Sequence, residues 1–203
     1  MANLFMNNLD GSLKLQTNHE LSEYLLVAHP SRDVNEKIFN EKKIFHSRYE
    51  HQWDLRFNPH ITIANFLAKE RMQETFIRWI QNICHLQKSF TVTLNNYSGF
   101  PPHGLYLRVQ DSQPFKRLAN ALKILDGFMQ SNDCPPLTLV SNPHITFVAG
   151  LSEYNYENAI EQYSQKIFHE SFHVDKLILL KRTSEKYFLI NTFILPPPMT
   201  LFD

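Results

Sequence analysis

The stretch "NPHITI" at residues 58–63 is nearly repeated by "NPHITF" at residues 142–147. In each copy the Asn-Pro step favours extended backbone, and the four residues after it alternate polar and apolar side chains. This alternation is typical of a strand, in which successive side chains point to opposite faces. Each copy therefore predicts a strand with a histidine and a threonine on one face and two apolar side chains on the other.

The sequence that follows each copy is also repeated. Apolar residues recur at the same offsets from each histidine, with the spacing that one buried helix face produces. They are Met72, Phe76, Trp79 and Ile83 after the first copy, and Tyr156, Ile160, Tyr163 and Ile167 after the second. Both copies therefore predict an amphipathic helix in the same phase, and chance alone does not explain the shared motif.

Strands are predicted after both helices. Residues 90–95, FTVTLN, alternate apolar and polar side chains, and residues 172–180, FHVDKLILL, predict a strand at the corresponding place. Residues 104–109, GLYLRV, and residues 185–195, EKYFLINTFIL, then predict the partner strands of two hairpins.

A strand leading into a helix is predicted ahead of each copy, in residues 23–30, EYLLVAHP, and in residues 105–114, LYLRVQDSQP. The apolar positions of the two helices are Val34, Ile38, Phe45 and Tyr49 in the first, and Phe115, Leu118, Leu122 and Leu125 in the second. The chain therefore predicts an α+β fold built by internal duplication of one unit of strands and helices.

Composition places the chain among ordinary globular proteins, since 43% of its 203 residues are hydrophobic and 20% are charged. The formal net charge of zero argues against bulk attraction to long nucleic acid or to an anionic membrane. No signal peptide or membrane-spanning stretch is predicted. Cys84 and Cys134 lack metal-type spacing, and we expect free thiols in a reducing compartment, the cytoplasm.

The shared polar face of the two predicted strands favours a binding site. Its members are His60, Thr62, His144 and Thr146. Imidazoles and hydroxyls have no place in a core unless they line a cleft, and an approximate two-fold axis would bring both sets into the same one. Such a cleft suits a phosphodiester, because hydroxyls can hold its oxygens while one imidazole accepts a proton and the other donates one.

The motifs "PHITI" and "PHITF" resemble the paired His-x-Thr motifs of the two-histidine (2H) phosphoesterase superfamily. Within it, the chain is similar to the branch of 2′-5′ RNA ligases and RNA 2′,3′-cyclic phosphodiesterases. The resemblance implies a single bilobal domain in residues 23–195, with two mostly antiparallel sheets lining a central cleft and helices outside. Residues 1–22 would then be an N-terminal extension, and residues 196–203 a C-terminal tail.

The resemblance also implies an activity, the opening of 2′,3′-cyclic phosphates on nucleotides or RNA ends without a metal or cofactor. By position, His60 and His144 would be the acid–base pair, and Thr62 and Thr146 would bind the phosphate. The substrate is the expected partner, with no membrane and no obligate protein partner. Two alternatives remain open: a 2′-5′ RNA ligase or linear 2′-5′ phosphodiesterase, and a module that binds phosphate or RNA ends without turnover.

Other candidate site residues carry weaker signals. Residues 169–173, HESFH, fit a zinc-protease pattern that works only on a helix, and the repeat places a strand start at Phe172 instead. Arg182 and Tyr187 could reach the cleft to bind phosphate or stack a base, and His103 could lie at its rim. The competing interpretations are an exposed arginine, a core tyrosine and a solvated loop histidine.

Overall fold

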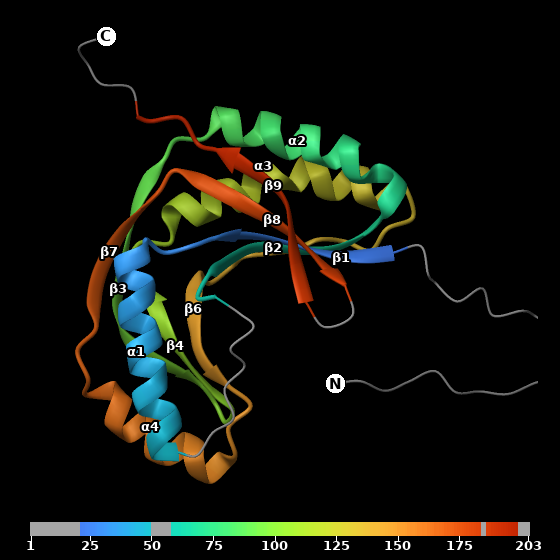
Figure 1. The fold of residues 1–203 in the computed structure, drawn as a ribbon. Coiled ribbons are helices and arrows are strands. Elements are labelled where there is room, and N and C mark those ends of the chain that lie inside the picture. Colours follow the sequence, from blue (N-terminus) through green and yellow to red (C-terminus); the bar gives the residue numbers. More distant parts are fainter. Residues whose placement is uncertain (1–20, 50–57, 184–185, 199–203) are drawn as a thin grey trace, which may run out of the picture.

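The computed structural model describes residues 21–49, 58–183 and 186–198, which form a curved antiparallel sheet with helices outside it (Figure 1). The strands are β1 (Leu21–Ala28), β2 (Ile61–Lys69), β3 (Phe90–Phe100), β4 (Gly104–Val109), β5 (Thr138–Leu139), β6 (His144–Ala149), β7 (His169–Val174), β8 (Lys176–Thr183) and β9 (Lys186–Ile194). The α-helices are α1 (Arg32–Tyr49), α2 (Gln73–Leu86), α3 (Gln113–Gln130) and α4 (Glu153–Ser164), and a 3₁₀ turn at Glu70–Met72 precedes α2.

The sheet consists of two halves that meet at its centre. Its strand order is β7-β3-β4-β6-β2-β1-β8-β9, and the short β5 pairs beside β2. We call β7-β3-β4-β6 the β6 half and β2-β1-β8-β9 the β2 half. One register pair, Ile61 with Ile145, joins β2 to β6. The α+β class and the antiparallel pairing are as predicted, and the two expected sheets are joined at this pair into one.

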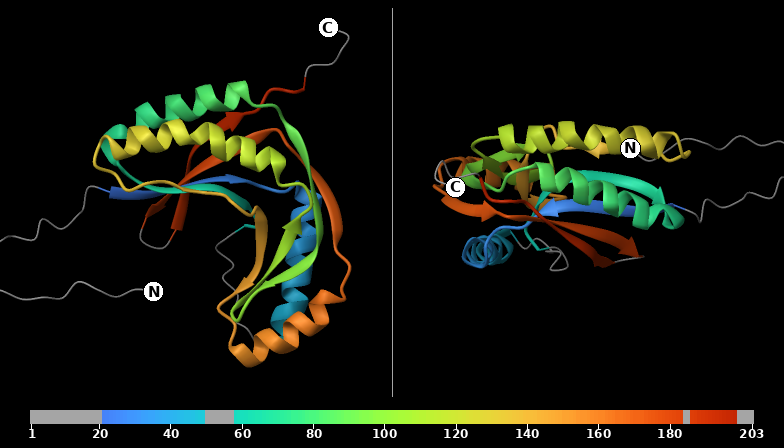
Figure 2. Two further views of the ribbon diagram at one scale, coloured as in Figure 1. Left: turned by 180° about the vertical axis from the view of Figure 1, so that it is seen from behind. Right: turned by 90° about the horizontal axis from the view of Figure 1, so that it is seen from above.

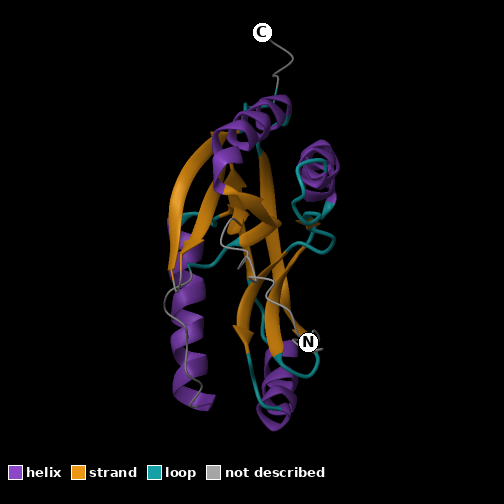
Figure 3. Cartoon of the chain, turned by 90° about the vertical axis from the view of Figure 1, so that its right-hand side faces the viewer, coloured by secondary structure: helices purple, strands orange, loops and turns teal. Residues whose placement is uncertain are grey.

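Each half is covered by two helices, one of which comes from the other half. Helix α2 packs on β9 and against α3, while α4 packs on β3 and β4 (Figure 2). Helix α1 follows β1 along the chain but packs on β6 and β7, and α3 follows β4 but packs on β2. Figure 3 shows the strands in the middle of the molecule and the helices around them. The connections therefore cross between the halves, and each half supplies a helix to the other.

The core lies between the sheet and the helices, and aromatic rings fill much of it. These rings are Tyr24, Phe66 and Phe76 in the β2 half, and Phe45, Tyr97, Phe147 and Tyr163 in the β6 half. Aromatic pairs of this kind add to the stabilisation that comes from apolar burial. The helices cover the outer face of the curved sheet (Figure 1). Side chains that alternate along each strand with the core residues therefore point to the inner face.

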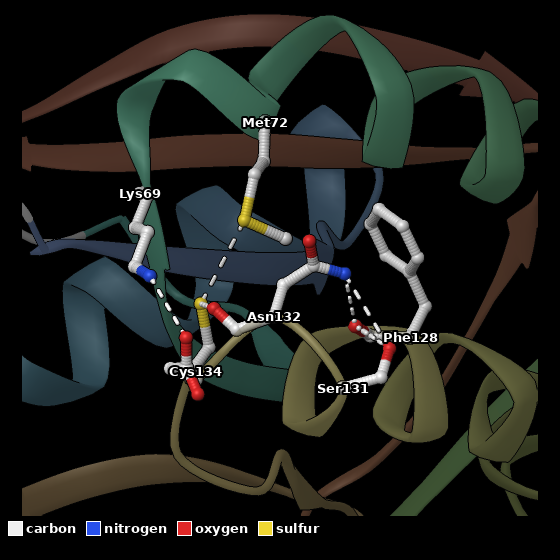
Figure 4. Close-up of polar contacts among 7 residues, drawn as sticks. Lys69, Met72, Phe128, Ser131, Asn132 and Cys134 are labelled. Atoms are coloured by element: carbon white, nitrogen blue, oxygen red, sulfur yellow. Dashed lines mark hydrogen bonds and ion pairs between the residues drawn. The ribbon is translucent and has the colours of Figure 1, made fainter.

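The segment after α3 is fastened to the start of α2, as Figure 4 shows. Asn132 Nδ2 donates to the carbonyl of Phe128 at 2.9 Å, and the Sγ atom of Cys134 lies 3.8 Å from Met72 Sδ. Lys69 lies at the end of β2 and forms an ion pair with Asp133. Both cysteines are free thiols, as predicted, and both are buried.

Most predicted elements are confirmed, including the four helices and both hairpins, β3–β4 and β8–β9. Two predictions are wrong. The helix face was expected to include Ile167, but α4 ends at Ser164 and Ile167 is 82% exposed. Residues 172–180 were expected to form one strand, but Asp175 separates β7, which pairs with β3, from β8, which pairs with β1 and β9.

Two further sequence predictions concern the N-terminus and the membrane. The N-terminal extension was predicted for residues 1–22, and residues 1–20 of it lie outside the described ranges. Strand β1 begins at Leu21, two residues before the predicted boundary. In the part of the chain that the structure describes, no helix combines the length and the apolar character needed to cross a membrane.

Candidate active site

The two His-x-Thr copies meet at the centre of the sheet. Ile61 and Ile145 are paired antiparallel and are both fully buried. The residues on either side of each isoleucine must therefore point to the opposite face, inside the curve. Antiparallel pairing sets the histidine of each strand across from the threonine of the other. The four side chains brought together in this way are His60, Thr62, His144 and Thr146.

Both histidines are held by the backbone in the same way. The Nδ1 atom of His60 lies 2.8 Å from the carbonyl oxygen of Asn58, and Nδ1 of His144 lies 2.8 Å from that of Asn142. A carbonyl oxygen can only accept a hydrogen bond, so Nδ1 must carry the proton in each ring. The Nε2 atom is then the one that exchanges protons. When a ring is neutral its Nε2 can accept a proton, and when the ring is charged its Nε2 can donate one.

The surroundings of His60 favour its neutral form. Burial lowers the pKa of the His60 imidazole below its usual 6.5, because a charged ring is poorly solvated there. The carbonyl of Asn58 opposes this shift through its hydrogen bond. Positive charges that lower the pKa further come from His29, Lys42 and His144. The influence of His144 also indicates that the two motif histidines lie within electrostatic range. We expect His60 to be neutral at pH 7.

The threonine hydroxyls are available to a ligand. Thr62 is half-buried and Thr146 is exposed. Among the described residues, none forms a hydrogen bond with either hydroxyl. Each hydroxyl can therefore donate to an oxygen that lies between the strands.

Three residues beside His144 were not identified from the sequence. On β4, Arg108 pairs with His144 and Tyr106 pairs with Thr146, so both side chains share the face of the motif. The ring of Phe100, at the end of β3, stacks on Tyr106 with centroids 4.2 Å apart. The His144 ring meets both edge-on, at 4.9 Å from Phe100 and 5.2 Å from Tyr106. Arg108 donates from Nε to the carbonyl of Asn95 at 3.0 Å.

A different set of residues lies beside His60. On β1, Val27 pairs with Thr62, and His29 follows the end of the strand. The His29 ring centroid is 6.0 Å from that of His60, and its Nδ1 lies 3.0 Å from the carbonyl of Pro59. Burial also lowers the pKa of His29. This third histidine holds the residue that precedes His60.

One signal in the sequence could have identified these neighbours. In GLYLRV, Tyr106 and Arg108 alternate with Leu105 and Leu107, which predicts that they face away from the core. The alternation does not identify the partner strand, because no local pattern indicates that β4 pairs with β6 in this register.

Arg182 and Tyr187, which the sequence marked as possible ligand contacts, form a polar cluster around Glu23. Arg182 Nη1 is 3.0 Å from Glu23 Oε2, and the Tyr187 hydroxyl donates to Glu23 Oε1 at 3.3 Å. Asn65 of β2 donates to the same oxygen at 3.3 Å. Glu23 and Val27 are on one face of β1, so the cluster shares the inner face of the sheet with the motifs but belongs to the β2 half alone.

His103 lies at the turn between β3 and β4. Its Nδ1 is 3.1 Å from the carbonyl oxygen of Leu151, and the Leu151 amide donates to the His103 carbonyl at 3.0 Å. The residue therefore fastens the hairpin to the segment that leads into α4. The structure brings it to this turn and does not group it with the two motif histidines.

The HESFH sequence lies entirely on a strand. Its five residues, 169–173, belong to β7, and both of its histidines are exposed. The strand was expected to start at Phe172, but it starts at His169, so the imidazoles do not share a helix face. Within the described ranges, no three histidine, cysteine, aspartate or glutamate side chains are grouped as a metal site requires.

A comparison with family models matches residues 33–186 to the 2′-5′ RNA ligase superfamily. The chain belongs to the 2′-5′ RNA ligase superfamily. The matched range holds both His-x-Thr copies, all strands of the β6 half, and β2 and β8 of the β2 half. The family resemblance predicted from the repeated motif is thereby confirmed. No curated protein matches the chain.

Solved structures of the superfamily share the fold. LigT of E. coli complexed with 3′-AMP has 16% sequence identity and a TM-score of 0.63, over 87% of this chain and 98% of that chain. LigT complexed with phosphate has 15% identity and a TM-score of 0.61, over 87% and 99%. TT0787 of Thermus thermophilus has 13% identity and a TM-score of 0.66, over 87% and 100%. At these identities the likeness shows the fold.

Proposed function

We propose that the protein is a phosphodiesterase that opens 2′,3′-cyclic phosphates on nucleotides or RNA ends by general acid–base catalysis, without a metal ion. The observation that carries the proposal is the pairing of Ile61 with Ile145. It places two imidazoles and two threonines of different strands on one face of the sheet. Each imidazole is held through Nδ1 by a backbone carbonyl, so that Nε2 is left for proton transfer.

The two histidines would have opposite roles. His60, whose pKa is lowered by burial, is neutral and takes a proton from water through Nε2. The water oxygen then bonds to phosphorus, and the bond from phosphorus to the 3′ oxygen breaks. His144, as the imidazolium, gives its Nε2 proton to that leaving oxygen. The product is a 2′-phosphate, and the pair has exchanged which ring is charged.

The threonines would hold the phosphate between the rings. Each hydroxyl can donate to one non-bridging oxygen, and a hydrogen bond to a charged group contributes about 1.5–3 kcal/mol. Thr62 and Thr146 lie across the same strand pair, so the two contacts would fix the phosphorus atom near the middle of the seam. LigT, which shares this fold, has been crystallised with phosphate and with 3′-AMP, and this supports a ligand that carries phosphate.

The test is hydrolysis of 2′,3′-cyclic AMP in the presence of EDTA, followed by chromatography of the products. We expect turnover to persist in the chelator. Because each general acid or base contributes about 10²- to 10⁴-fold, His60→Ala and His144→Ala should each lower kcat by that factor. Circular dichroism of both variants should match that of the parent protein.

Other outcomes would favour the alternatives. Loss of activity on chelation would indicate a metal enzyme. Binding of the cyclic nucleotide without any product would indicate a recognition module. Faster cleavage of a linear 2′-5′ dinucleotide than of the cyclic phosphate, or joining of two RNA ends, would replace the cyclic substrate with a 2′-5′ linkage.

A further inference from the structure

The hairpin of β3 and β4 ends in two stacked rings beside the proposed acid. The rings of Phe100 and Tyr106 are stacked, with an interplanar angle of 26° and centroids 4.2 Å apart. The His144 ring meets Phe100 at 70° and Tyr106 at 61°, so its edge lies against both. The proposed acid–base chemistry does not require these two rings.

Phe100 faces the site and not the core. Tyr97, three residues earlier on β3, has its ring among Phe147 and Tyr163, which lie on the helix side of the sheet. Phe100 pairs with Gly104 and contacts Tyr106 on the inner side. A large apolar side chain is normally covered, yet 43% of Phe100 remains exposed although one of its faces lies on Tyr106.

The backbone next to Phe100 is fixed by close packing. A Cβ atom on Gly99 would lie 2.2 Å from the hydroxyl of Tyr156 on α4. Only glycine therefore lets β3 lie this close to the helix. At the turn, the His103 amide donates to the Phe100 carbonyl at 2.9 Å, and the contacts of His103 with Leu151 hold the tip. The two rings are thus presented by a hairpin that is fastened at both ends.

We propose that Phe100, backed by Tyr106, is the stacking platform for the nucleobase of the substrate. This inference rests on the proposed function and narrows it to substrates that carry a base next to the cyclic phosphate. A base and its 2′,3′-phosphate are joined by one ribose, so the base site must lie within one sugar of the histidines. Phe100 meets this condition through its contact with His144. Stacking accepts any base, since every base has an aromatic face.

Among the described residues, the stacked rings lie on the His144 side of the site. The β4 residue that pairs with Thr146 is Tyr106, whereas the β1 residue that pairs with Thr62 is Val27. A base on Phe100 places its ribose on the side of His144. Both phosphate ester oxygens belong to that ribose, and water must approach phosphorus from the side opposite the leaving oxygen. The platform therefore gives His144 the leaving oxygen and His60 the water, the same assignment that the burial of His60 supports.

The first experiment compares 2′,3′-cyclic AMP with 1-O-methylribose 2′,3′-cyclic phosphate, which has the sugar and phosphate but no base. Stacking on an aromatic side chain favours the nucleotide by about 5- to 150-fold, and we expect this ratio of kcat/KM in the parent protein. Phe100→Leu should remove most of the ratio, which compares two substrates of the same variant and so does not depend on any general change in turnover. Phe100→Trp should retain or increase it.

The matched control is Phe188→Leu. Phe188 is a phenylalanine of similar exposure, 52%, on β9 of the other half. We expect the ratio to stay at the parent value in this variant. A second measurement needs no variant. The fluorescence of 2-aminopurine riboside 2′-phosphate should decrease when it binds to the parent protein, because stacking on an aromatic ring quenches the emission of 2-aminopurine.

Each outcome separates the platform from the chemistry. If the parent turns over both substrates equally, or Phe100→Leu keeps the preference, the platform is wrong and the proposed function stands. If 2-aminopurine binds without quenching, the base does not stack and the platform is again wrong. If neither cyclic phosphate is turned over, the proposed function itself is wrong.

Discussion

The two NPHIT copies have the same sequence but different neighbours. His60 lies beside His29 in a buried setting that lowers its pKa. His144 lies beside stacked aromatic rings, including Tyr106, and pairs with Arg108 on the next strand. The repeated residues supply the two imidazoles that we propose as proton carriers, and the residues that are not repeated make their surroundings unequal. A duplicated motif can thus support an asymmetric reaction when the adjoining strands differ.

The strands that make this difference hold equivalent places in the sheet. β1 lies next to β2, and β4 lies next to β6. Each of these strands places its side chains against one His-x-Thr copy, and each leads into a helix that crosses to the other half. The comparison of the two neighbourhoods can therefore be tested by substitutions in either strand.

The largest effect is expected from substitution of His60 and His144, the proposed base and acid. A substrate whose leaving group needs no proton distinguishes the two roles. On 2′,3′-cyclic AMP, both His60→Ala and His144→Ala should lose about 10²- to 10⁴-fold in kcat. The 4-nitrophenyl ester of 3′-deoxyadenosine 2′-phosphate releases 4-nitrophenolate, which needs no proton. With this ester His144→Ala should recover most of its rate and His60→Ala should not, as measured by absorbance. If the rate recovered in His60→Ala and not in His144→Ala, His60 would be the acid and His144 the base.

A smaller loss is expected from the threonines. Thr62→Val and Thr146→Val remove one hydroxyl each and keep the side-chain shape. Each should lower kcat/KM about 10- to 150-fold, which corresponds to one hydrogen bond to a charged group. The serine variants keep the hydroxyl and should retain most of the activity in the same steady-state assay. Unchanged kcat/KM in both valine variants would contradict phosphate contact.

The two arginines on the inner face offer a matched pair with a modest expected effect. Arg108 pairs with His144 on the sheet, while Arg182 is held by Glu23 in the β2 half. Both are exposed, so the charge of either contributes little in salt. Arg108→Gln should raise KM for 2′,3′-cyclic AMP by up to about fivefold, more at low ionic strength, and Arg182→Gln should not. A larger increase of KM in Arg182→Gln than in Arg108→Gln would indicate that the phosphate binds nearer to the Glu23 cluster.

The smallest effect is a shift of the pH profile. A base with a lowered pKa places the acid limb of kcat/KM below pH 6.5, since activity is lost only when His60 gains a proton. In His29→Asn the amide can still donate to the Pro59 carbonyl, but the positive charge is gone. The pKa of His60 should then rise and the limb should move to higher pH. His85→Asn, at an exposed position on α2, is the control and should leave the limb in place.

Local sequence patterns were sufficient for most of the elements and for the shared face of the four motif residues. The offsets of Phe76 and Tyr156 from the motif histidines identified α2 and α4, because helix phase is a property of a short segment. The alternation in NPHIT likewise placed His60 and Thr62 on one face. Each of these predictions needed no knowledge of distant parts of the chain.

What could not be predicted depends on which strands become neighbours. Residues 172–180 are largely apolar, and no local pattern shows that the chain changes partners at Asp175. The aromatic neighbours of His144 come from β3 and β4, whose register with β6 is fixed by tertiary packing. The sequence around His29 predicts only the end of a strand, because the contact of His29 with Pro59 joins separate segments.

The exchange of α1 and α3 between the halves has a consequence for how the molecule can be divided. The ring of Phe45 on α1 packs against Phe147 of β6, so a fragment without α1 would leave the β6 half partly bare. A fragment without α3 would do the same to β2. A polypeptide with only one copy of the unit could cover its sheet only by trading helices with a second molecule. The two imidazoles are therefore brought together only when both halves of the fold have formed.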